Sequence, residues 1–105
     1  MLEIPLEAVP NQRLLAVLAG QNCTISVYQR GRRLYLDLAG DDKIVRQGAV
    51  CLPRVPLLGD VQQFAGQLFF VDMGAQPVRQ EPPQWQGLGS RWKLIYLDNE
   101  ELQKL

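Results

Sequence analysis

The chain has 105 residues, 47% of them hydrophobic, and its eleven basic and eleven acidic side chains cancel to a formal net charge of zero. This length suits a single domain, residues 1–105, and zero net charge argues against nucleic acid or an anionic membrane as a partner. Histidine is absent, which excludes Ser-His and Cys-His nucleophiles, His-ligated zinc sites and the usual general base near neutral pH. We therefore expect a non-enzymatic protein, without metal or cofactor, that binds partners through local patches.

The N-terminal stretch LEIPLEAVP alternates, with Leu2, Ile4 and Leu6 directed inward. Pro5 and Pro10 exclude a central position in a sheet, so we expect an edge strand. The stretch lacks the charged and apolar segments of a secretion signal, and no apolar run approaches the roughly 18 to 20 residues of a membrane-spanning helix. We therefore expect no membrane insertion and a protein that is made and kept inside a cell.

Alternation with a period of two is clearest in the next part of the chain. RLLAVLA, residues 13–19, is short for a helix and ends before Gly-Gln, which favours a strand that turns. NCTISVYQ (residues 22–29) and RLYLDLA (residues 33–39) place alternate side chains on opposite faces, which predicts a β-hairpin. Its turn contains Gly31, which can take the positive φ of short hairpin loops.

Cys23 and Cys51 are the two cysteines, so the alternatives are one disulfide and two free thiols. Cys23 has the same alternation parity as Ile25 and Val27, which indicates burial in the core. Small intracellular domains rarely need a disulfide, so two buried thiols are expected. Neither spacing nor context indicates CxxC redox chemistry or a zinc site.

A second turn at residues 40–42 leads into KIVRQGAVCL, a further strand in which Gly48 marks a bulge or a close backbone approach. Beyond it, residues 52–66 contain two prolines and two glycines, which indicates an extended crossover with one helical turn around Asp60 to Phe64. QLFFVDM, residues 67–73, is predicted to be a strand again.

The C-terminal third begins with a long polar loop, residues 74–89, which holds three prolines. Loops longer than about 12–15 residues in a small domain are usually functional or mobile. RWKLIYL, residues 91–97, returns as a strand, and residues 98–105 form a polar tail, either a short capped helix or a frayed end. Six to eight short strands separated by Gly and Pro turns, with little helix, predict an all-β fold, a small antiparallel β-barrel or sandwich.

The glycines of GLGSRW, residues 87–92, invite comparison with phosphate-binding loops. Such loops need a strand before the glycines and a helix after them, whereas here a proline-rich loop precedes and a strand pattern follows. The third glycine of GxGxxG would also fall at Trp92. We interpret Gly87 and Gly89 as a tight turn into the last strand, with Arg91 near the end of the sheet.

The hairpin turn carries the dense basic patch of the chain: Arg30, Arg32 and Arg33. Tyr28 and Tyr35 lie on the outward side of the same hairpin and could serve as stacking platforms for nucleic acid. Acidic residues follow closely between residues 37 and 42, which favours a solvated hairpin tip. A third alternative, a patch that docks a protein partner, is compatible with either of these interpretations, because Arg and Tyr are common at interfaces.

Two strand carboxylates, Asp37 and Asp72, could in principle act together in acid-base chemistry. No feature of the sequence places them together, and an aspartate in a strand more often faces solvent or accepts a hydrogen bond from a turn. Trp85 lies in the long loop, off any periodic face, and is therefore a better interface candidate than Trp92, whose parity fits packing.

Several segments, taken in order, resemble small phage tail proteins of the cyanophage baseplate plug family. The matching stretches are residues 4–6, 9–12, 20–29, 34–38, 48–54, 66–72 and 87–97. Each stretch alone is weak, but their joint order and spacing are specific. The loop at residues 74–86 departs from the family, because it is proline-rich and lacks an Asp-rich character.

The resemblance implies a non-enzymatic structural component of a contractile tail baseplate, which helps to close the central hub or tube until infection. It implies contacts with other baseplate or tail-hub proteins and a place in the virion after assembly in the host cytoplasm, and it is compatible with a homo-oligomer and with a prophage. We expect the partner contacts at Arg30, Arg32, Arg33, Trp85, Gln86 and Arg91.

The alternative is a stand-alone β-barrel module that binds a small ligand or a carbohydrate on Tyr28, Tyr35 and Trp85. A roomy pocket lined by aromatic side chains would favour this module. A filled interior with exposed loop aromatics would favour the assembly component.

Overall fold

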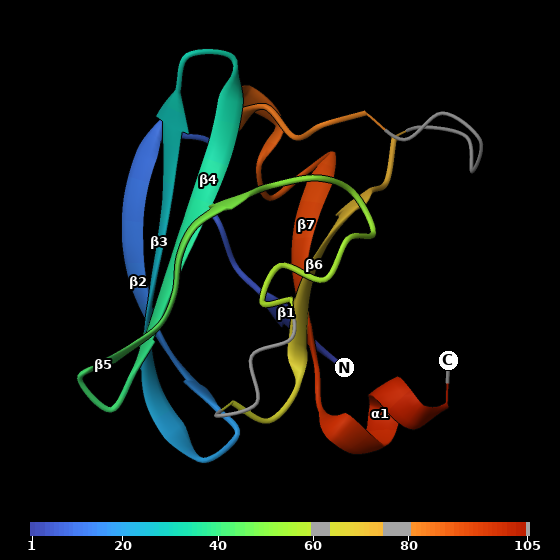
Figure 1. Cartoon of the computed structure of the whole chain (residues 1–105). Helices are drawn as coiled ribbons and strands as arrows, with labels where there is room; N and C mark the ends of the chain where they lie inside the picture. Colours follow the sequence, from blue (N-terminus) through green and yellow to red (C-terminus); the bar gives the residue numbers. More distant parts are fainter. Residues whose placement is uncertain (60–63, 75–80, 105) are drawn as a thin grey trace.

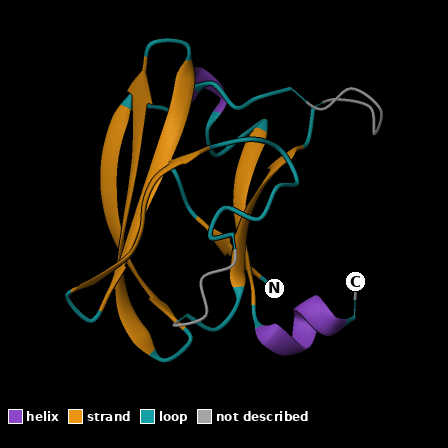
Figure 2. Cartoon of the chain, viewed as in Figure 1, coloured by secondary structure: helices purple, strands orange, loops and turns teal. Residues whose placement is uncertain are grey.

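Two antiparallel sheets face each other in the computed structural model, which describes residues 1–59, 64–74 and 81–104 (Figures 1 and 2). The first sheet has the spatial order β1 (Leu2–Ile4), β7 (Trp92–Leu97), β6 (Gln67–Asp72). The second has the order β2 (Asn11–Leu18), β3 (Gln21–Arg30), β4 (Arg33–Gly40), β5 (Lys43–Val50). Of the two predicted architectures, the sandwich is the one that forms.

Two short helices accompany the sheets: a 3-10 helix, Trp85–Gly87, and the C-terminal α1, Asn99–Gln103. Asp98 caps α1, because its carboxylate accepts a hydrogen bond from the Glu101 backbone N–H and the Glu101 side chain accepts one from the Asp98 N–H. Of the two alternatives for the polar tail, a short capped helix and a frayed end, the capped helix is the one that forms. Within the described ranges, no helix has the length and apolar character needed to cross a membrane.

The alternation of the sequence decides which face of each strand is buried. In β3 the odd-numbered residues Cys23, Ile25 and Val27 are buried, and they pair across the hairpin with inward residues of β4. The predicted hairpin is confirmed, including its turn, where Gly31 has a φ of 62°. The β4–β5 ladder shifts register near Gly48, which has a φ of 70°, so this glycine marks an irregularity as expected.

The chain passes between the sheets twice, after β1 and after β5 (Figure 1). The second crossover runs beside β6, where the Arg54 N–H donates to the Phe70 carbonyl at 2.8 Å and the Leu57 N–H donates to the Leu68 carbonyl at 2.9 Å. The extended crossover is thus confirmed. The helical turn expected around residues 60–64 lies mostly outside the described residues.

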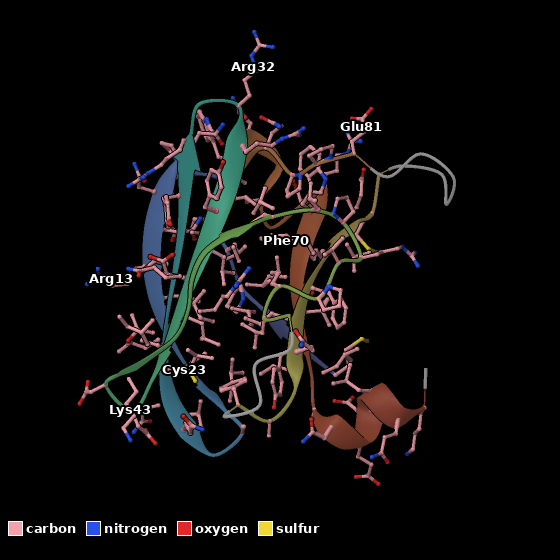
Figure 3. The ribbon with its side chains drawn as sticks, viewed as in Figure 1. Arg13, Cys23, Arg32, Lys43, Phe70 and Glu81 are labelled. Carbon is pink, nitrogen blue, oxygen red and sulfur yellow. The ribbon has the colours of Figure 1, made fainter. Side chains whose placement is uncertain are left out.

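The core fills the space between the sheets, and Phe70 lies at its centre (Figure 3). Cys23 and Cys51 are free and buried, as predicted, and burial raises the pKa of both thiols. Leu2 has the inward parity but is 47% exposed, because it lies in a three-residue edge strand. The buried apolar side chains include Ile4, Leu6, Leu18, Ile25, Val27, Leu34, Leu36, Leu38, Leu57, Leu58, Phe64, Leu68, Phe70, Leu88, Trp92, Leu94 and Tyr96.

Two neighbouring phenylalanines of β6 test this placement of the core. Phe70 is fully buried between the sheets, so Phe70→Ala is expected to lower the free energy of unfolding by about 3–5 kcal/mol through the cavity it leaves. Phe69 lies on the opposite, partly exposed face of the same strand, and Phe69→Ala is expected to cost at most about 2 kcal/mol. Urea unfolding followed by circular dichroism measures both, and equal losses would contradict the core between the sheets.

Candidate partner-binding surfaces

A buried ion pair fixes the end of the first sheet next to the long loop. Asp72, the last residue of β6, is 3% exposed, and its two carboxylate oxygens accept hydrogen bonds from Arg91 Nε at 2.8 Å and Arg91 Nη2 at 2.9 Å. Asp72 shares the inward parity of Leu68 and Phe70, which is why it is buried. Of the two alternatives for a strand aspartate, exposure to solvent is wrong for Asp72, whereas acceptance of a hydrogen bond from a turn is confirmed, because the Gly74 N–H donates to its Oδ1 at 3.1 Å.

Glu81 and Trp92 complete this cluster. The Glu81 backbone N–H donates to Asp72 at 3.1 Å, its carboxylate accepts from Arg91 at 2.9 Å, and its carbonyl accepts from the Trp92 indole N–H at 3.0 Å. The Arg91 guanidinium also lies 4.4 Å from the centre of the Trp92 ring. These contacts hold the chain against the first sheet at Glu81. Glu81 lies toward the same end of the molecule as Arg32 (Figure 3).

Electrostatics keep this cluster charged. The hydrogen bonds from Arg91 lower the pKa of Asp72 to about 2, although burial alone would raise it. The same pair raises the pKa of the Arg91 guanidinium above its usual range. A carboxylate locked in its ionised form, with its oxygens occupied, suits a structural clamp better than acid-base work.

Asp37, the other strand carboxylate, belongs to the second sheet and does not join Asp72. Its Oδ1 accepts hydrogen bonds from the Tyr28 hydroxyl at 2.9 Å and from the Gly48 N–H at 2.7 Å. Burial, followed by this bond to Asp37, raises the pKa of Tyr28. The pair that acid-base chemistry would need is therefore not formed. Among the residues that the structure describes, no group of three His, Cys, Asp or Glu is placed to hold a metal.

The glycines before β7 have the structural role that the sequence suggested. Gly89 has a φ of 83° and its N–H donates to the Trp92 carbonyl at 2.9 Å, which closes the turn into the strand. A Cβ at Gly87 would collide with the Trp92 ring. In the 3-10 helix that ends at Gly87, Trp85 is half-buried and packs against the core, while Gln86 is exposed. The segment is a tight, packed turn and not a phosphate loop.

The β3–β4 hairpin tip presents three exposed arginines: Arg30, Arg32 and Arg33. Behind it, the rings of Tyr28 and Tyr35 stack with centroids 6.0 Å apart, and the Arg30 guanidinium lies 5.4 Å from the Tyr28 ring. In the described part of the chain these arginines form no ion pair with a carboxylate. The tip and the 3-10 helix lie at the same end of the sandwich (Figures 1 and 2).

Two of the larger hollows in the surface show little aromatic lining. One of about 550 Å³, on the outer face of the second sheet, is lined by Tyr28 but by neither Tyr35 nor Trp85. Another, of about 400 Å³, lies on the outer face of the first sheet. It is lined by Met1, Arg54, Phe69, Val71, Ile95 and Leu97. Neither of these two hollows, as formed by the described residues, gathers the aromatic trio expected of a ligand-binding module.

The Asp72 clamp predicts a specific dependence of stability on pH. Because the folded-state pKa of about 2 lies below the ordinary 3.8, the clamp stabilises the fold fully above about pH 4 and progressively less as the pH falls toward 2. Asp72→Asn is expected to lower the free energy of unfolding at pH 7 by about 1.5–3 kcal/mol. The difference in free energy of unfolding between the wild type and Asp72→Asn should become smaller as the pH falls from 4 to 2.

Urea unfolding of both proteins across this pH range measures the effect. Asp42→Asn, in an exposed turn, serves as the control and is expected to change stability at pH 7 by less than about 0.5 kcal/mol. If the wild type and Asp72→Asn differ by the same free energy of unfolding at pH 7 and at pH 2, the charge of Asp72 does not contribute to the stability of the fold.

Comparisons with known proteins show the family of the chain. Comparison with the curated proteins gives no match. The family described as cyanophage baseplate Pam3 plug gp18 matches residues 1–100, which is nearly the whole chain. The match runs through both sheets, the arginine tip and the Asp72 clamp, and supports a structural role in the baseplate of a phage tail. The chain therefore belongs to the cyanophage baseplate Pam3 plug gp18 family.

Proposed function

We propose that this chain is a non-enzymatic component of a contractile tail baseplate that helps to close the central hub or tube through contacts with neighbouring subunits. The family match over residues 1–100 carries the proposal. A β-sandwich with a filled core supports it, because such a domain offers its surface for contacts with neighbouring subunits. The protein would enter the virion during assembly in the host cytoplasm.

The arginine tip is the surface that we assign to the first of these contacts. Arg30, Arg32 and Arg33 are exposed, and the stacked tyrosines behind them stiffen the hairpin. A stiff cationic projection suits an acidic groove on a neighbouring subunit, because little conformational freedom is lost on binding.

The loop at the same end supplies the second part of the contact. Gln86 is exposed, and Trp85 is half-buried and held by packing against the core. Arg91 clamps the loop through Asp72 and Glu81, and the remaining edge of its guanidinium is available to a partner because the side chain is 35% exposed. Aromatic and arginine side chains of this kind often dominate interface energies.

Charge reversal at the tip tests the assignment. Arg32→Glu combined with Arg33→Glu is expected to reduce incorporation into tail particles more than tenfold, because like-charge contacts cost several kcal/mol at an interface. Complementation of a deletion in the encoding phage or prophage, with particles counted by electron microscopy and the chain quantified by immunoblot, measures this. Lys43→Glu is the matched control, since Lys43 lies at the opposite end of the sandwich (Figure 3).

Normal assembly of the doubly reversed variant would show that the tip is not the contact surface. If Arg32→Ala and Trp85→Ala also assembled at the wild-type level, the whole end of the sandwich would be excluded. Absence of the wild-type chain from purified particles would contradict the baseplate role itself.

A further inference from the structure

The outer edge of β2 exposes backbone groups that have no partner in the described part of the chain. The Gln29 N–H donates to the Pro10 carbonyl at 2.9 Å, and this bond sets the phase of the β2–β3 ladder. Hydrogen-bonded pairs alternate along an antiparallel ladder, so the even-numbered residues of β2 bond to β3. The N–H and C=O groups of Asn11, Arg13, Leu15 and Val17 therefore point away from the sheet.

The other sheet edges are blunted, each in its own way. The crossover covers β6 through the hydrogen bonds of Arg54 and Leu57. β1 has three residues and is followed by Pro5, and β5 is irregular at Gly48. By contrast, β2 pairs with β3 in unbroken register over eight residues and contains neither a proline nor a bulge. Natural proteins seldom leave an edge of this length open unless another chain pairs with it.

Apolar side chains flank this edge on the outer face of the sheet. Leu15 is 80% exposed and Val17 is 67% exposed. The register continues from Leu15 through Thr24 and Ala39 to Ile44, which is 72% exposed. An added strand would cover the apolar side chains of β2 from the side, as well as satisfying the backbone groups.

The charges of the same face are mostly positive. Arg13 points away from the core on the β2 side (Figure 3) and lines a hollow of about 270 Å³ together with Arg46. The adjoining hollow is lined by Arg13 and Arg30. The one carboxylate that lines either hollow belongs to Asp37, which already accepts the Tyr28 and Gly48 hydrogen bonds. A carboxylate from a partner would therefore find three guanidinium groups on this face.

We propose that the edge of β2 accepts, as an added strand, an extended segment of another tail subunit. This segment carries an Asp or Glu beside Arg13 and apolar side chains beside Leu15 and Val17. Backbone hydrogen bonds to residues 11–17 supply affinity, and the side chains supply specificity, as in other cases of strand addition. The inference rests on the proposed baseplate function and adds to it the site and the chemistry of one partner.

A second copy of this chain fits the edge less well. β2 contains no Asp or Glu, so pairing of β2 with β2 would leave Arg13 without a carboxylate. It would also bring the two basic faces together. An acidic segment of a different subunit would pair with the outward backbone N–H and C=O groups of β2 and would also supply a carboxylate to Arg13.

Hydrogen exchange with residue resolution tests the site. In the purified chain the amides of Arg13, Leu15 and Val17 are expected to exchange rapidly, whereas those of Leu14 and Ala16 are protected by β3. In purified tail particles that contain the chain, the three outward amides are expected to slow by at least about 100-fold. Fast exchange at these amides in such particles would overturn the inference and leave the baseplate function intact.

Two other outcomes are informative. Protection of the three amides in the purified chain, together with a dimer mass in sedimentation, would identify a second copy as the occupant and overturn the acidic segment. Absence of the chain from particles would overturn the baseplate function, and with it this inference. The two failures are therefore distinguishable.

Two substitutions test separately the contribution of the Arg13 charge and that of the β2 backbone hydrogen bonds. Arg13→Glu is expected to reduce incorporation more than tenfold without a shift in the urea midpoint of the purified chain. Lys104→Glu, directly after the end of α1, is the control that keeps incorporation normal. Leu15→Pro removes an outward N–H that β3 does not use, so it should fold but fail to incorporate. Normal incorporation of both Arg13→Glu and Leu15→Pro would overturn the inference.

Discussion

The ion pair between Asp72 and Arg91 is the interaction on which one end of this sandwich depends. A carboxylate with 3% exposure would destabilise the core by several kcal/mol if it were unpaired. Two hydrogen bonds from one guanidinium remove that penalty and, with the bond from the Met73 N–H to the Arg91 carbonyl at 2.7 Å, hold the ends of β6 and β7 in register. Glu81 is fixed on the same pair, so the position of the following 3-10 helix derives from it.

Although the net charge of the chain is zero, its arginines differ in whether a carboxylate of the same chain neutralises them. Arg91 is directed at carboxylates of its own chain, and its charge is neutralised locally. The arginines of the tip and Arg13 on β2 have no such partner among the described residues, so their charge is available to other molecules. Net charge alone therefore predicts the absence of a long-range field, but it says little about the local potential that a neighbouring subunit meets at contact.

Much of the fold could be predicted from the sequence because its signals are local. The alternation in residues 22–29 and 33–39, with Gly31 between them, determines a hairpin whose partners are close in the chain. The pairing of β1 with β7 joins Leu2 to Tyr96 and has no local signal, so the order of the strands and the open edge of β2 could not be derived. The 3-10 helix also lacks a signal, since Gln84 makes no side-chain cap.

The candidate surfaces were predictable only in part, for a related reason. The exposure of the three tip arginines follows from a short turn, whereas the partners of Arg91 depend on a contact between residues 72, 81 and 91 that only the tertiary fold creates. The parity of Asp72 with Leu68 and Phe70 was a usable sign of burial. The general tendency of aspartate to face water predicts the opposite.

Two of the surfaces assigned to partners, the arginine tip and the edge of β2, lie on one sheet, and their geometry connects them. Asn11, at the start of β2, pairs with Tyr28, which stacks behind the arginine tip. The eight residues of β2 extend from that point for roughly 26 Å at about 3.3 Å per residue. A segment that pairs with β2 therefore begins or ends beside the tip, so one acidic subunit can occupy both surfaces. In the first sheet, the edge strand β1 is short and the edge strand β6 is covered by the crossover. An added strand can therefore pair with the open edge of the four-stranded sheet, at β2.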